Sequence, residues 1–114
     1  MIIAIDFDNT IAFTDFPKIH SVRPGAIETI SQLRKEGHYV IVWTCRCDKD
    51  LTDAINFMLE TGIEFDRIND NHPDNVRKYR FNSRKINADI YIDDKNIGGF
   101  SSWYDVQKIF NLKK

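Results

Sequence analysis

A run of five apolar residues opens the chain and ends abruptly in acids. Residues 1–5 contain no polar side chain, and Asp6-Phe7-Asp8-Asn9-Thr10 follows at once. Such a run is typical of a strand that is buried on both faces, as in a parallel sheet. In open parallel α/β sheets, ligands bind outside the carboxyl ends of the strands. The first ten residues therefore favour an α/β fold that delivers Asp6 and Asp8 to the place where such folds perform chemistry.

Helical and strand-like patterns alternate along the rest of the chain. Amphipathic patterns predict helices over residues 24–36 and about 50–61, each followed by a glycine. Apolar runs predict strong strands at 39–43 and 88–92, and a weaker strand at 63–65. The polar stretch 69–84 predicts a long loop with room for a short helix.

A last helix is predicted near the end of the sequence. Ser101 or Ser102 can cap this helix at its N-terminus. We expect four of its apolar side chains to point inward: Trp103, Val106, Ile109 and Phe110.

Strands that alternate with helices imply parallel pairing through right-handed crossovers. We therefore predict one Rossmann-like, three-layer α/β domain over residues 1–114, with a parallel sheet of four or five strands. The carboxyl ends of parallel strands lie along one rim. That rim would bring together the acidic pair Asp6 and Asp8, Thr44, and the acidic pair Asp93 and Asp94.

Composition excludes several classes of protein. The net charge is −1, so the molecule as a whole offers no field that attracts nucleic acid or membrane. No apolar stretch approaches the length of a membrane span, and no signal peptide is visible, so we expect a cytoplasmic protein. Cys45 and Cys47 are predicted to be reduced thiols beside a strand end, because no Cys or His pair completes a zinc site.

Four carboxylates in one crevice repel each other unless some are protonated or a cation lies among them. A ligand set made only of oxygen atoms favours Mg²⁺, bound by one or two carboxylates together with a substrate phosphate. A carboxylate is also a competent nucleophile toward phosphorus. A hydroxyl such as Thr44 and a cation such as Lys85 are suitable partners for phosphoryl oxygens.

These residues resemble the motifs of the haloacid dehalogenase-like phosphohydrolases. Residues 6–10 match the Asp-x-Asp-x-Thr signature, which is the first motif of that family, and Thr44 is similar to the second motif. A lysine before the last core strand is similar to the third motif, and Asp93-Asp94 is similar to the fourth. The resemblance covers essentially the whole chain, in the expected order. It implies a Mg²⁺-dependent phosphatase that acts through an aspartyl-phosphate.

The resemblance also implies a role for each matching residue. Asp6 would be the nucleophile, and Asp8 the general acid and base whose backbone carbonyl also binds the metal ion. Asp93 would bind Mg²⁺, with Asp94 acting directly or through water. Thr44 would contact the transferring phosphoryl group. For the lysine, Lys85 is favoured over Lys78 because it lies closer to the strand.

Members of this family often carry a cap domain, but this chain has no room for one. About thirteen residues separate Thr10 from Pro24, which suffices only for a small flap over residues 11–23. Exclusion of water must then come from that flap, from the substrate, or from another subunit of a homo-oligomer.

Two basic features could contact the substrate. Arg46 is interpreted either as a phosphate ligand or as a surface arginine. The segment 77–85 interleaves basic and aromatic residues, a pattern that can hold backbone phosphates and stack bases. It allows a nucleotide or a phosphorylated nucleic-acid end as substrate, and a solvated loop as the alternative.

Two other functions compete with a phosphatase. A signalling receiver domain has a similar size and also clusters acids, Thr and Lys, but its acid pair, phosphorylated Asp and Lys follow a different order along the strands. A catalytically silent phospho-ligand binding protein is disfavoured because Asp6 and Asp8 are both present.

Overall fold

Strands β4 and β1 form the centre of a four-stranded sheet. The computed structural model describes residues 1–112. The strand order is β5-β4-β1-β6, and all three pairings are parallel. The strands span Ile2–Ile5 (β1), Tyr39–Val42 (β4), Arg67–Ile68 (β5) and Ile90–Ile92 (β6). The predicted α/β fold with a parallel sheet is confirmed, and it is consistent with a Rossmann-like three-layer arrangement.

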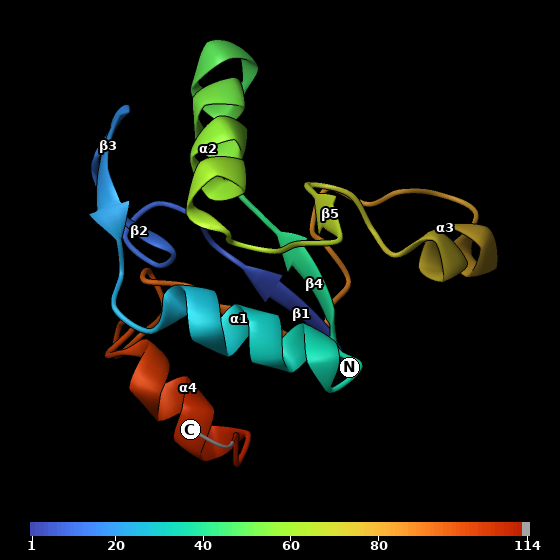
Figure 1. Cartoon of the computed structure of the whole chain (residues 1–114). Coiled ribbons are helices and arrows are strands. Elements are labelled where there is room, and N and C mark those ends of the chain that lie inside the picture. Colours follow the sequence, from blue (N-terminus) through green and yellow to red (C-terminus); the bar gives the residue numbers. More distant parts are fainter. Residues whose placement is uncertain (113–114) are drawn as a thin grey trace.

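The register aligns the strand ends. Ile5 lies opposite both Val42 of β4 and Ile92 of β6. The residues that follow these three strands therefore leave the sheet at the same level. Figure 1 shows β1 and β4 pointing in the same direction, toward a hairpin of two short strands, Ala12–Asp15 (β2) and Lys18–Val22 (β3).

Most of the core lies on one face of the sheet, because alternate strand residues point to opposite faces. Ile3 and Ile5 of β1 point to this face, as do Val40 and Val42 of β4. Three helices cover them with buried side chains: Ala26–Lys35 (α1), Asp48–Thr61 (α2) and Trp103–Ile109 (α4). In Figure 1, α4 lies beside α1 at the bottom of the view.

The other face carries a smaller core of Ala4, Ile41 and Ile86. Part of its cover comes from residues after β5, which include the short helix α3 (Pro73–Tyr79). None of the residues of α3 is buried. The predicted long loop with a short helix is thus present, and its return segment supplies Ile86. No described helix is long and apolar enough to cross a membrane.

Two local predictions are wrong. The weak strand predicted at 63–65 forms instead at Arg67–Ile68. Gly62 ends α2 in the left-handed conformation, and the amides of Gly62 and Ile63 both donate to the Met58 carbonyl. This cap commits Ile63 to the end of the helix, where its side chain enters the core.

Ile109 was expected to point inward, but it is 75% exposed. Trp103 and Val106 are buried, and Phe110 is partly buried against the same core. At 3.6 residues per turn, Ile109 lies roughly 120° around the helix from Trp103, whereas Phe110 returns to nearly the same direction. The face of α4 that meets the core therefore excludes Ile109.

We expect Trp103→Phe to lower the free energy of unfolding by about 1–3 kcal/mol. The Trp103 indole is fully buried and donates to the backbone carbonyl of Thr10 at 2.8 Å. The substitution would leave that carbonyl without its partner. Ile109→Ala on the same helix is the matched control and should change the stability by less than about 0.5 kcal/mol. Urea unfolding measures both, and equal losses would contradict the assigned helix orientation.

Candidate active site

The chain makes a tight turn as it leaves β1. The carbonyl of Phe7 accepts hydrogen bonds from the amides of Thr10, Ile11 and Ala12 at 3.3, 3.0 and 3.2 Å. Asn9 adopts a positive φ of 58°, a conformation that Asn tolerates better than most residues. The turn points the Thr10 side chain back toward the sheet, where it is fully buried.

The Thr10 hydroxyl joins the ends of two strands. It donates to a carboxylate oxygen of Asp6 at 3.1 Å and accepts from the backbone amide of Asp94 at 3.0 Å. The Asp6 amide also donates to the Ile92 carbonyl at 2.9 Å, which extends the pairing of β1 with β6. These bonds fix Asp6 against the pair Asp93-Asp94.

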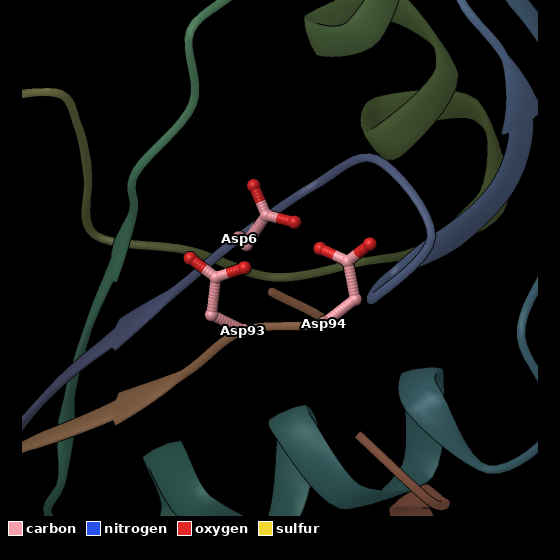
Figure 2. A group of neighbouring side chains, drawn as sticks. All are labelled: Asp6, Asp93 and Asp94. Atoms are coloured by element: carbon pink, nitrogen blue, oxygen red, sulfur yellow. The ribbon is translucent and has the colours of Figure 1, made fainter. Parts of the chain in front are cut away.

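Three carboxylates converge at this point. Asp6, Asp93 and Asp94 each offer an oxygen atom, and these oxygens lie within 4.8 Å of one another. Figure 2 shows the three side chains gathered where β1 and β6 end. One oxygen of Asp94 is buried and has no hydrogen-bond partner among the described residues. A buried carboxylate oxygen without a partner is costly, and a bound cation would satisfy it.

The carboxylate cluster changes the acidity of Asp6. Burial raises the pKa of Asp6 most, from 3.8 to about 8, aided by a hydrogen bond with Asp94 that only a protonated Asp6 can donate and by the negative charges of Asp93 and Asp94, while Thr10 acts in the opposite direction. A cation among the three carboxylates would favour the charged form instead. The donor set consists only of carboxylate oxygens, which suits a hard divalent ion such as Mg²⁺.

Asp8 does not join this cluster. Its carboxylate forms a two-pronged ion pair with Arg46, whose Nε and Nη2 lie 2.9 and 2.7 Å from the Asp8 oxygens. Thr14 of the hairpin donates to the same carboxylate at 2.8 Å. Asp6 and Asp8 nevertheless line one pocket, so two carboxylates in different environments face the same space.

Arg46 is not a surface residue, because it is only 2% exposed. Besides Asp8, its guanidinium donates to the backbone carbonyls of Asp50 and Pro17 at 3.2 and 3.1 Å. It also lies over the Phe16 ring, 5.0 Å from the centroid. Its donors are thus used within the chain, and the residue links Asp8 to the start of α2 and to the hairpin tip. This is a positioning role that its sequence context did not indicate.

The pocket has a volume of about 270 Å³. Its lining includes the acidic residues Asp6, Asp8, Asp93 and Asp94, together with Arg46 and Cys45. Phe16, which is 62% exposed at the tip of the hairpin, also borders it, so the predicted flap does reach the site. Cys45 and Cys47 are both free and exposed, as expected.

Lys95 is the lining cation that sequence reasoning missed. It directly follows the acidic pair, and its amide donates to Asp93 at 3.0 Å. That adjacency was the available signal, because residues just after a strand end share its rim.

Lys85 and Thr44 do not line the pocket. Lys85 is exposed, and its ammonium lies 5.4 Å from the centre of the Tyr91 ring, on the face of the sheet that carries the smaller core. Lys78 is also exposed, on α3. Thr44 follows β4 as predicted, but its hydroxyl accepts the Arg46 amide at 3.1 Å. The structure thus brings the two acidic pairs and Arg46 together at one pocket. It does not bring Lys85 or Lys78 to that pocket.

Comparison with known proteins identifies a solved structure that is similar to this chain. No family model and no curated protein matches the chain. A solved structure of a conserved protein from Bacteroides thetaiotaomicron is similar to the whole of this chain, with 36% sequence identity and a TM-score of 0.85. The match covers 100% of this chain and 93% of that one. This chain belongs to the same family as that conserved Bacteroides protein.

The raised pKa of Asp6 predicts how the stability of the metal-free protein depends on pH. Between pH 4 and 8 the folded state holds a proton on Asp6 that the unfolded state has lost, so stability should fall as pH rises through this window. In a chelator, Asp6→Asn should flatten this dependence and raise the Tm at pH 8, by roughly 4–6 °C for each 1 kcal/mol gained. Adding Mg²⁺ should stabilise the wild type more than this variant.

Asp53→Asn is the matched control, because Asp53 lies outside the pocket on α2 and pairs with Lys49. Thermal melts across pH measure all three proteins. A wild-type Tm that rises from pH 5 to pH 8 in chelator would contradict the described carboxylate cluster.

Proposed function

We propose that this protein is a Mg²⁺-dependent phosphohydrolase of the haloacid dehalogenase-like type, which cleaves phosphate monoesters through an aspartyl-phosphate on Asp6. The observation that supports this most is the grouping of Asp6 with Asp93 and Asp94 beside a pocket that also contains Asp8. Two carboxylates with different neighbours in one pocket can divide nucleophilic and acid–base work between them.

The residues present fit a magnesium ion. Asp6, Asp93 and Asp94 would hold it, and the resemblance adds the backbone carbonyl of Asp8. The unpartnered Asp94 oxygen supports this assignment, because no described protein group satisfies it. When bound, the ion would neutralise negative charge on the phosphoryl group and keep Asp6 ionised.

The chain's own residues would carry out two displacements. In the first, an Asp6 oxygen attacks phosphorus, the ester P–O bond breaks, and Asp8, which must enter this step protonated rather than as the carboxylate paired with Arg46, donates its proton to the departing oxygen. In the second, Asp8 takes a proton from water, the water oxygen attacks phosphorus, and inorganic phosphate leaves the regenerated Asp6 carboxylate.

The surrounding residues would position these groups. Arg46 and Thr14 fix the orientation of the Asp8 carboxylate. Thr10 holds Asp6 at the end of β1. Lys95 borders the pocket, and its charge would attract phosphoryl oxygens. Phe16 would contact the leaving group and exclude water from one side.

The substrate would be a phosphorylated compound, such as a nucleotide or a phosphorylated nucleic-acid end, acted on in the cytoplasm. Residues 77–85, which suggested the nucleotide, do not line the pocket and so would not position it there. The hairpin is the only described cover beside the pocket, so a second copy of the chain would be the other source of cover.

Turnover of p-nitrophenyl phosphate with Mg²⁺ tests this mechanism. Asp6→Asn should lose nearly all activity, because an amide cannot attack phosphorus. Asp8→Asn should also be slow, by 10²-fold or more as expected for loss of an acid–base group. Because an activated leaving group needs no proton, Asp8→Asn should still be phosphorylated and should accumulate the phosphoenzyme, which Asp6→Asn cannot form.

Asp53→Asn provides the control for removing one carboxylate elsewhere and should keep wild-type turnover. Chelation should abolish the activity of both active proteins. Self-labelling without turnover would favour a receiver-like domain, binding without labelling would favour a silent phospho-ligand protein, and wild-type turnover by Asp6→Asn would contradict the proposed nucleophile.

A further inference from the structure

A basic and aromatic surface lies outside the acidic pocket. Residues 77–85 read Arg-Lys-Tyr-Arg-Phe-Asn-Ser-Arg-Lys, and all nine are exposed. Five are cations and none is acidic, in a chain whose net charge is −1. None of the nine lines the acidic pocket. Figure 1 shows α3 on the opposite side of the molecule from the β2–β3 hairpin that borders that pocket.

Internal contacts use only part of this positive charge. Arg77 pairs with Asp74, and Lys85 lies over the Tyr91 ring. The side chains of Lys78, Arg80 and Arg84 form no salt bridge with a described residue. Three exposed cations of one short segment therefore have no carboxylate partner, and one of them, Lys78, lies over the Tyr79 ring at 5.2 Å from its centre.

Two aromatic rings lie among these cations. Tyr79 is 49% exposed and Phe81 is 70% exposed. Both border a surface hollow of about 230 Å³. The rest of its lining is polar, consisting of Asn71, Asn75, Ser83 and Asn87. The rings offer stacking faces, and the side chains of Asn75 and Asn87 beside them offer hydrogen-bond donors and acceptors.

The surface is organised before any ligand binds. Asn71 is only 4% exposed, and its side-chain nitrogen donates to Asn82 Oδ1 at 2.7 Å and to the Ser83 carbonyl at 3.1 Å. Its Oδ1 accepts the Asn87 amide at 2.7 Å. These bonds hold the segment after α3 against the segment before it. A pre-ordered loop loses less entropy on binding than a flexible one.

We propose that this surface binds single-stranded nucleic acid. Bases would stack on Tyr79 and Phe81 and reach the amide-lined hollow, while Lys78, Arg80 and Arg84 neutralise backbone phosphates. Stacking on aromatic rings combined with cations along the backbone is how single strands are bound without sequence readout. An acidic peptide would use the cations but leave the exposed rings and the hollow without a matching group. This inference goes beyond the proposed phosphatase and does not depend on it.

Fluorescence anisotropy with a labelled thymidine oligonucleotide of about 10 nucleotides tests the proposal. The measurement is made in chelator, so that metal-dependent binding at the acidic pocket does not contribute. We expect saturable binding whose log–log salt slope is roughly −2, for three neutralised phosphates. Tyr79→Ala/Phe81→Ala should weaken binding about tenfold or more. Arg80→Ser/Arg84→Ser should weaken it and flatten the salt slope.

Lys35→Ser/Lys108→Ser removes the same charge from exposed positions on α1 and α4 and should leave the affinity nearly unchanged. Arg80→Lys/Arg84→Lys keeps the charge and should retain binding. Thermal melts check that each variant is folded. Absence of binding by the wild type at low salt, equal losses in the Lys35/Lys108 control, or tighter binding of a poly-glutamate peptide would overturn the proposal. Phosphatase activity on a small ester is measured separately, so the two proposals can fail independently.

Discussion

The buried hydroxyl of Thr10 is the interaction on which the arrangement of the candidate site depends. It donates to Asp6 and accepts from the Asp94 amide, so one side chain ties the Asp6 carboxylate to the backbone after β6. The Thr10 carbonyl is in turn held by the buried indole of Trp103. A core residue of the last helix thus supports the turn that presents the first acid. Packing and carboxylate geometry are therefore coupled through one residue.

This coupling explains how the folded protein can hold three mutually repelling carboxylates close together. Bringing Asp6, Asp93 and Asp94 together costs free energy, as the raised pKa of Asp6 reflects. The parallel register, the Thr10 bonds and the helix-covered face of the sheet offset that cost by fixing the backbone of both strand ends. Such stored electrostatic strain is typical of functional sites and would be relieved by a cation.

The sequence predicted the parts of the fold that rest on strong periodic patterns and on strand ends. The apolar run at residues 1–5 and the acids that follow it predicted β1 and the position of Asp6. The apolar run before Asp93 and Asp94 predicted β6 and placed this acidic pair at the same edge of the sheet. The burial of Arg46 was not predictable, because it depends on contacts with Asp8 and with Pro17 at the hairpin tip. Lys85 was expected near the acidic site because it lies close to β6 in the sequence. The segment before β6 instead runs over the other face of the sheet and carries Lys85 there.

A crystal structure with Mg²⁺ and vanadate tests the central claim most directly. Vanadate mimics a phosphoryl group under attack, so it reports both the nucleophile and the cation. We expect one metal ion ligated by carboxylates of Asp6, Asp93 and Asp94, with vanadium within bonding distance of an Asp6 oxygen and with Asp8 on the opposite side of the vanadate. A metal ion bound away from these residues, or vanadate held on the sheet face near Lys85, would contradict it.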